Sequence, residues 1–435
     1  MKITVIYGAY ILMTAALLFL VDHWLCRSSD KYRNSVGARV IVSFIILAFL
    51  FIPPLSTLLR ENLYKYYLQR FGYTMLGFIM YGGGFLLIAT VIEFFVRLVH
   101  HVHTKRRGAD APEQAESFDE QAGDFDEQQE TDETTPSDDY TQPAWSKRIY
   151  AIVFTLIVIS SVAINVTGIM HARDIQIKKY SISMDKAVKS RDSLRVAHIS
   201  DLHISYNSDV EVIDQMVSKL NAEKPDVVFV TGDLFSSEYG SIKDPDEYIK
   251  ALKKIKAKEG VYWVYGNHDV EESLFYGFSL DEPEEVKRPK KMVRFLKKSG
   301  FTILEDEYAA ICGGEIQLVG RKDGEKPVAK AEARKTPAEL LNDIDKNKPV
   351  LVLQHEPRDL EELAANGADA SFCGHTHAGQ IFPGIIFTSM VEPVPYGMKD
   401  ISGMKVVVSS GAGCYGAPIR VLTDSEVVIA DIAFK

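Results

Sequence analysis

Residues of the types that bind divalent metal ions gather at five places in the C-terminal half of the chain. Each place directly follows a short β-branched run, and the groups are Asp201 with His203, Asp233, Asn267 with His268 and Asp269, His355, and His375 with His377. Carboxylates, an amide and imidazoles can hold two divalent cations about 3.5–4 Å apart, and such a pair clamps the attacking and leaving oxygens of a phosphoryl transfer. The residue types therefore indicate two-metal hydrolysis of a phosphate ester.

The local spacing fits the same chemistry. In the Asp-x-His and His-x-His pairs the two ligands fall on one side of an extended segment, because side chains alternate there. Glycine precedes Asp233, Asn267 and His375, where it permits a tight turn and close approach of the backbone. A single Gly-Asp pair would be ordinary turn chemistry, but five clusters at equivalent strand ends indicate a common site.

The elements that must position these residues alternate between short β-branched runs and amphipathic stretches. The predicted strands are Leu194–Ser200, Val227–Thr231, Val261–Tyr265, Ile316–Val319, Pro349–Leu353, Ala370–Cys373, Val406–Ser409 and Val427–Ile432. The predicted helices are Val210–Leu220, Pro245–Lys256, Val286–Lys298 and Asp359–Ala365. This alternation predicts an α/β domain with one large sheet or two packed sheets, and ligands bind such sheets beyond the carboxyl ends of the strands.

The ordered series Asp-x-His, Gly-Asp, Gly-Asn-His-Asp, a lone His and Gly-His-x-His resembles the calcineurin-like metallophosphoesterase superfamily over about Arg195 to Ser410. The stretch Gly374–Gln380, and Ser409–Gly413 leading to Arg420, resemble the bacterial membrane-anchored branch of that superfamily. Ala378 departs from the glycine common in that branch and affects only local backbone freedom.

The resemblance implies an αββα sandwich with two divalent metal ions at its edge. It implies one metal on Asp201, His203 and His377, a second on Asn267, His355 and His375, and Asp233 bridging them. It implies that a metal-bridging hydroxide attacks, that His268 stabilises phosphoryl charge or protonates the leaving oxygen, and that Asp269 orients His268. The ligand types suit Mn, Fe or Zn without choosing among them.

Four uncharged apolar runs precede this domain, at about 3–21, 40–59, 71–92 and 149–170. Each approaches the roughly 20 residues that a helix needs to cross a bilayer. The sequence therefore predicts an N-terminal four-helix transmembrane region joined to the α/β domain. The predicted segments are three transmembrane helices in 1–107, a linker at 108–146, a fourth transmembrane helix in 147–170, and the catalytic domain at 171–435.

The linker carries 13 acidic residues and no Lys or Arg, so the rest of a chain with net charge −10 is close to neutral, at +3. A near-neutral remainder excludes a strong nucleic-acid binder. The linker is too polar to bury a core, so it is expected to be disordered; it acts as a solvated connector or, alternatively, binds a partner. Ten basic residues flank the apolar runs on the side of the membrane that holds the linker, and eight flank them on the opposite side. Because basic residues are more frequent on the cytoplasmic side, the linker is predicted to be cytoplasmic. The catalytic domain of this multi-pass cell-membrane protein is then predicted to be extracytoplasmic.

Two other features have competing explanations. Gly411–Gly416 satisfies Gly-x-Gly-x-x-Gly, but Pro418 and a β-rich tail follow it where dinucleotide binding requires a helix. Arg420 is either a phosphate-contacting residue of the substrate site or a structural ion-pair residue. The four cysteines contain no Cys-x-x-Cys pair, so neither a disulfide framework nor a zinc knuckle is indicated. Cys373, at the end of a predicted strand, is interpreted as a small core residue in preference to a nucleophile.

These observations predict an integral-membrane hydrolase of phosphate mono- or diesters. Its location favours a membrane or cell-envelope substrate, including lipid-linked esters, while protein partners stay unidentified. One alternative is a cytoplasm-facing nucleotide phosphodiesterase. The other is a non-catalytic, metal-stabilised binding protein, which would not need His268 and Asp269.

Overall fold

A computed structural model describes residues 2–56, 59, 63–109, 144–275, 278–281, 287–326 and 333–435. The chain forms two compact units. One comprises residues 13–45 and 80–160, and the other comprises residues 1–12, 46–79 and 161–435. Nearly all of the acidic linker lies outside the described residues.

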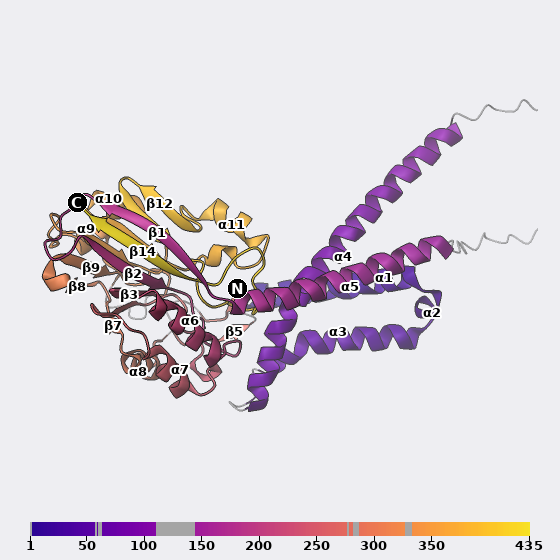
Figure 1. Ribbon diagram of the computed structural model, residues 1–435. Helices are drawn as coiled ribbons and strands as arrows, with labels where there is room; N and C mark the ends of the chain where they lie inside the picture. Colours follow the sequence, from indigo (N-terminus) through magenta and orange to yellow (C-terminus); the bar gives the residue numbers. More distant parts are fainter. Residues whose placement is uncertain are drawn as a thin grey trace, which may run out of the picture. The chain divides into compact units, whose positions relative to one another are not determined.

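The N-terminal part is helical (Figure 1), with α1 at Lys2–Ser28, α2 at Asp30–Arg33, α3 at Val36–Ser56, α4 at Leu63–Ala109 and α5 at Ala144–Arg173. In the described part of the chain, three helices are long and apolar enough to cross a membrane, over Thr4–Ser28, Leu63–His103 and Ala144–Arg173. The second predicted span falls on α3, where Val36–Ile52 is described as a shorter apolar stretch. The structure thus confirms three long candidate spans, and the remaining one stays a prediction.

A polar cluster joins the long helices within the unit of residues 13–45 and 80–160. Glu93 lies at its centre: His23 Nε2 is 2.8 Å from Glu93 Oε2, and the Tyr150 hydroxyl donates to Glu93 Oε1 at 2.7 Å. The Trp24 indole N–H donates to Thr90 Oγ1 at 2.8 Å. Since polar groups are costly in hydrocarbon unless they are paired, these bonds help to hold the helices together.

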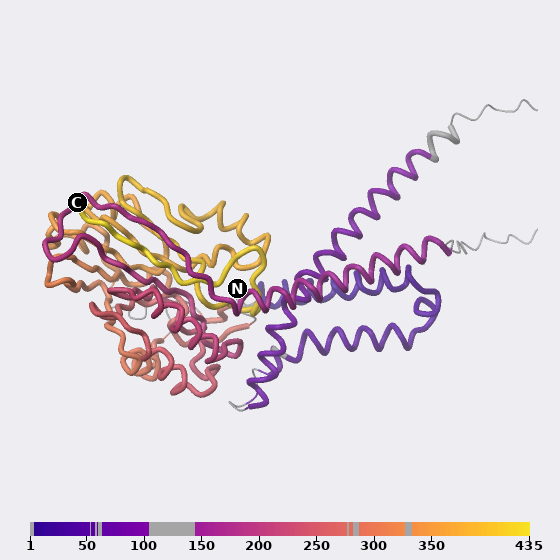
Figure 2. Tube along the Cα trace, in the orientation of Figure 1, coloured from indigo at the N-terminus to yellow at the C-terminus, as the bar shows by residue number. Residues whose placement is uncertain are grey.

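Twelve strands of the C-terminal part form two mixed sheets. In spatial order the first holds β1 (Gln176–Met184), β14 (Glu426–Phe434), β2 (Ser193–Ile199), β3 (Val227–Thr231), β4 (Val261–Val264) and β7 (Thr302–Ile303). The second holds β12 (Gly397–Ile401), β13 (Met404–Val408), β11 (Ala370–Cys373), β10 (Val350–Leu353), β9 (Ile316–Gly320) and β8 (Glu307–Ile311). The short pair β5 (Leu274–Phe275) and β6 (Phe278–Ser279) stands apart. Figure 2 shows β1 and β14, from opposite ends of the domain sequence, side by side.

Three hydrophobic cores define the layers. The first joins one face of the first sheet to α6 (Val210–Ala222), α7 (Pro245–Leu252) and α8 (Lys290–Ser299). The second lies between the sheets, where Phe229 of β3 meets Phe372 of β11 with ring centroids 5.2 Å apart. The third joins the second sheet to α9 (Pro337–Leu340) and α10 (Leu360–Ala365). These layers match the αββα sandwich that the resemblance implies.

Parallel pairing brings the functional strand ends together. β2, β3 and β4 are parallel neighbours in one sheet, and β10, β11 and β13 are parallel neighbours in the other. Of these strands, β3, β10 and β11 are buried along their whole length, as expected for parallel sheets covered on both faces. The loops that follow them meet at one edge of the sandwich.

Candidate metal centre

Seven predicted ligands lie in the loops that follow five parallel strands. Six of the side chains are buried and that of His375 is half-buried. They are Asp201 and His203 after β2, Asp233 after β3, Asn267 after β4, His355 after β10, and His375 and His377 after β11. The structure therefore brings together residues spread over more than a third of the chain.

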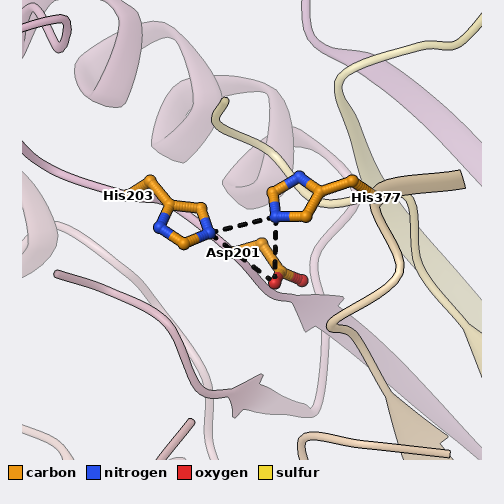
Figure 3. Close-up of side chains that lie close together, drawn as sticks. All are labelled: Asp201, His203 and His377. Carbon is orange, nitrogen blue, oxygen red and sulfur yellow. Dashed lines mark hydrogen bonds and ion pairs between the residues drawn. The ribbon is translucent and has the colours of Figure 1, made fainter. Parts of the chain in front are cut away.

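The first ligand group consists of Asp201, His203 and His377 (Figure 3). The Nε2 atoms of His203 and His377 are 3.0 Å apart. Asp201 Oδ1 lies 3.4 Å from His377 Nε2 and 3.9 Å from His203 Nε2. Three donor atoms from two sheets thus face a common point.

The second group consists of Asn267, His355 and His375. Asn267 Oδ1 is 3.0 Å from His355 Nε2 and 3.3 Å from His375 Nδ1. Asp233 Oδ2 lies 3.1 Å from His355 Nε2 and 3.7 Å from His203 Nε2. Asp233 is therefore the carboxylate between the two groups, the position that a bridging ligand requires.

The donor set fits a pair of divalent cations. Ligand atoms within each of the clusters Asp201–His203–His377 and Asp201–Asp233–His355 lie within 4.8 Å of one another. Burial raises the pKa of Asp201 to about 6, with a further contribution from the charge of Asp233. Buried like charges are unfavourable unless a cation compensates them, so these carboxylates match metal ligation better than they match an apolar core.

Backbone strain is concentrated at the same residues. Asp201, His203, Asp233, His375 and His377 all have φ between 45° and 72°, the left-handed region that side chains with a Cβ seldom occupy. Strained backbone of this kind persists where the surrounding structure enforces it, and it clusters at functional sites. Here the tight loops return each ligand toward the sheet edge.

Asp269 occupies a different position from the orienting role that the resemblance implies. Its carboxylate accepts hydrogen bonds at 2.8–3.2 Å from four backbone N–H groups, those of Asp233, Leu234, Phe235 and Gly266. These bonds join the loop after β3 to the loop after β4. Asp269 therefore fixes the position of the Asp233 loop, whereas the ring of His268 has other neighbours.

The side chains of Ser237 and Glu272 face the Nδ1 atom of the His268 ring. His268 Nδ1 is 2.9 Å from Ser237 Oγ and 3.7 Å from Glu272 Oε1. The Ser237 hydroxyl donates to Glu272 Oε1 at 2.6 Å, as does Lys326 Nζ at 2.6 Å. Burial acts to raise the pKa of Glu272, but hydrogen bonds from His268, Lys326 and Ser237 lower it to about 2. A buried carboxylate thus fixes the orientation of the His268 ring.

Two further residues near the site were not predicted. The Asn267 amide Nδ2 donates to Glu325 Oε2 at 2.9 Å, which leaves Oδ1 facing the histidines. Tyr415 lies over His268 with ring centroids 4.2 Å apart. Tyr415 belongs to the glycine-rich loop Gly411–Gly416. The glycine pattern of that loop was the one sequence feature that could have pointed to Tyr415.

Arg420 is also placed differently from the predicted phosphate contact. Its guanidinium is buried and donates to the backbone carbonyls of Ser410 at 2.5 Å, Gly411 at 3.2 Å, Gly413 at 2.8 Å and His377 at 3.3 Å. The partners of Arg420 among the described residues are thus backbone carbonyls, and the described residues give it no ion pair. Arg420 fastens the Gly411–Gly416 loop to the turn that carries His377.

Comparison with known proteins locates the similarity in this domain. The family model described as calcineurin-like phosphoesterase matches residues 194–379. An uncharacterized metallophosphoesterase of Helicobacter pylori is 30% identical over 261 residues, covering 58% of this chain and 62% of the relative. One from Aquifex aeolicus is 28% identical over 263 residues, covering 60% and 93%. A transmembrane protein with metallophosphoesterase domain from Danio rerio is 28% identical over 255 residues, covering 57% and 54%. The match to the Helicobacter relatives spans about three fifths of their length.

Proposed function

Because residues 194–379 of this chain belong to the calcineurin-like metallophosphoesterase superfamily, we propose that the protein hydrolyses phosphate mono- or diesters presented at a membrane or cell envelope, lipid-linked esters included. The observation that supports this most directly is the position of Asp233 between two groups of buried ligands. The candidate spans support the membrane location of the substrate.

In this proposal Asp201, His203 and His377 would hold one divalent ion, Asn267, His355 and His375 would hold the other, and Asp233 would serve as a ligand between them. The two ions, when bound, supply Lewis-acid activation of the phosphoryl group and of the water that attacks it. The sequence and the donor types favour Mn, Fe or Zn.

The chain's own groups handle the proton of the leaving oxygen. Nδ1 of His268 faces Ser237 and Glu272, so Nε2 is the ring atom available to the substrate. With Nδ1 held by these two residues, the ring is positioned to stabilise phosphoryl charge or to protonate the leaving oxygen. Asp269 contributes by holding the Asp233 loop in place.

We place the catalytic domain on the extracytoplasmic side, because the larger number of basic residues flanks the linker side of the spans. The cytoplasm-facing nucleotide phosphodiesterase is the second candidate, because the difference between ten basic residues and eight is small. A C-terminal tag on intact cells separates the two. Protease access from outside supports our placement, and access only after lysis supports the alternative.

The activity test uses the full-length chain in nanodiscs with added Mn²⁺, a chromogenic phosphomonoester and a phosphodiester. We expect metal-dependent turnover that collapses in Asp233→Asn and in His268→Ala. His171→Ala is the matched control, because this histidine pairs with Asp424 on the surface. If two ions bind per chain and neither ester is hydrolysed, the non-catalytic binding protein becomes the better explanation.

A further inference from the structure

The helix α11 (Gly384–Val391) carries an exposed apolar surface beside the metal centre. Its sequence, Gly-Ile-Ile-Phe-Thr-Ser-Met-Val, contains no charged residue. Large apolar side chains on it and beside it are 41–78% exposed; they are Phe382, Ile386, Phe387, Met390, Val391 and Leu422. We call these six residues the apolar lip. A contiguous exposed surface of this kind marks an interaction site and differs from scattered surface apolar residues.

The apolar lip is rigidly joined to the turn that carries His377. A Cβ added to Gly379 would lie 2.1 Å from the backbone nitrogen of Ile385, so the turn and the helix are in direct backbone contact. The Gly384 N–H donates to the Ile381 carbonyl at 2.6 Å. At the other end of the helix, the Thr376 hydroxyl donates to the Pro395 carbonyl at 2.7 Å. Movement of α11 would therefore move the loop that carries His375 and His377.

The apolar lip is also continuous with the end of a candidate span. The Arg420 N–H donates to the carbonyl of Gly168, in the last turns of α5, at 3.0 Å. The next residue, Val421, pairs with Ile381 and accepts from the Phe382 N–H at 3.1 Å. Leu422, 78% exposed, follows directly. A short path of backbone contacts thus leads from the membrane helix to α11, and all of it lies within one compact unit.

Charges around the apolar lip suit a headgroup region. Glu392, directly after α11, is paired with Arg358 at 3.0 Å, so its negative charge is offset. Lys399 Nζ lies 3.2 Å from the Pro393 carbonyl and is exposed. An exposed basic side chain such as that of Lys399 favours contact with anionic lipid headgroups when it lies beside an apolar surface.

We infer that the apolar lip inserts into the surface of the bilayer that α5 crosses, and that the metal centre takes its phosphate ester from that surface. The bilayer is the occupant that the geometry favours, because the lip continues from the end of a candidate span. The part of this inference that concerns substrate rests on the proposed function, whereas the insertion itself does not.

Insertion is tested on the full-length chain in nanodiscs of phosphatidylcholine and phosphatidylglycerol. Phe387→Cys is introduced into a chain that already carries Cys26→Ser, and it is labelled with a nitroxide. The Cys26→Ser chain without Phe387→Cys, treated with the same label, gives the background signal. Tyr308→Cys is the matched control, since Tyr308 is 58% exposed on β8, at the opposite edge of the second sheet from β12. We expect oxygen to relax the label at residue 387 more strongly than a water-soluble nickel chelate does, and the reverse at residue 308.

Two outcomes would overturn the insertion. One is a label at residue 387 as open to the nickel chelate as the label at residue 308. The other is spin–spin broadening at residue 387 that disappears on dilution with unlabelled chains, which would assign the apolar lip to contact between two copies of the chain.

The substrate part is tested with Phe387→Asn combined with Met390→Asn. We expect hydrolysis of a soluble chromogenic ester to stay within twofold of the unaltered chain, while hydrolysis of a vesicle-embedded lipid phosphate ester falls about tenfold. Equal rates on the embedded ester would refute delivery from the bilayer. Absence of hydrolysis by the unaltered chain on both esters would instead refute the proposed function, and the nitroxide result would stand independently.

Discussion

The ring of Tyr415 stacks on the imidazole of His268, with ring centroids 4.2 Å apart and ring planes inclined by 29°. The same ring lies 5.0 Å from that of His203, a predicted metal ligand. The Gln380 carboxamide holds Tyr415 in place by accepting its backbone N–H at 2.8 Å. One aromatic side chain therefore covers both a predicted ligand and the imidazole expected to act on the leaving oxygen.

Replacing Tyr415 tests this stacking. Aromatic pairs contribute about 0.5–1.5 kcal/mol beyond their buried area, so we expect Tyr415→Ala to lower kcat/KM roughly two- to tenfold and Tyr415→Phe to retain most of it. Steady-state kinetics on the chromogenic ester measure both. Equal losses in the two variants would assign the effect to the hydroxyl instead of the ring.

Glu272 should matter most when the leaving group needs a proton. General acid catalysis contributes about 10²–10⁴-fold, and Glu272→Gln weakens the fixation of the His268 ring, which is expected to protonate the leaving oxygen. We expect kcat on an alkyl phosphate to fall at least about tenfold, with a much smaller loss on a 4-nitrophenyl ester. Glu271→Gln is the control, because Glu271 contacts Lys291 and the Tyr239 N–H instead. Equal losses on both esters would speak against this positioning role.

Removing the metals should cost both activity and stability. Ligands that bind only the folded state stabilise it by about 2.7 kcal/mol at 100 times Kd, which corresponds to about 5–10 °C in Tm for a domain of this size. We expect chelation to lower Tm by that order and re-added Mn²⁺ to restore it. Elemental analysis should find two ions per unaltered chain and fewer in Asp233→Asn. An unchanged Tm and metal content in Asp233→Asn would contradict the bridging position.

Gly374 is a position where a single methyl group should disrupt the site. A Cβ there would lie 1.8 Å from Ser200 Oγ and 2.3 Å from Asp201 Oδ2. Overpacking of this kind costs about 1–3 kcal/mol, so Gly374→Ala should lower the free energy of unfolding and weaken metal binding. Gly37→Ala, with no atom within 4 Å of the added Cβ, should do neither. Denaturation and metal titration together decide the matter.

Arg420 should behave as a structural residue. Lysine keeps the charge but cannot replace the planar set of guanidinium donors, so Arg420→Lys should leave buried carbonyls without a donor, at about 1–3 kcal/mol. We expect a lower Tm with KM unchanged in the folded protein. A raised KM at an unchanged Tm would restore the phosphate contact expected from the sequence.

Much of the fold could be predicted because its central strands are buried on both faces. Such strands appear in the sequence as uninterrupted apolar runs, and all eight predicted strands exist with small changes at their ends. Six of the fourteen described strands were not predicted, namely β1, β5, β6, β7, β8 and β12. Of these, β1 and β12 have largely exposed side chains. Edge strands of this kind are set by pairing with a neighbour, here β14 and β13, and pairing leaves little trace in local composition.

The candidate site, like the fold, could be predicted from the sequence only in part. The sequence by itself determined the identity and order of the predicted ligands, because each one directly follows its strand along the chain. Only the tertiary structure decided what surrounds them. Asp269 is next to His268 in sequence, yet backbone N–H groups occupy its carboxylate, while Glu272 and Ser237 reach the imidazole. Ser237 follows β3 and Glu272 follows β4, so their meeting depends on the pairing of two neighbouring strands of the first sheet, which no local pattern encodes.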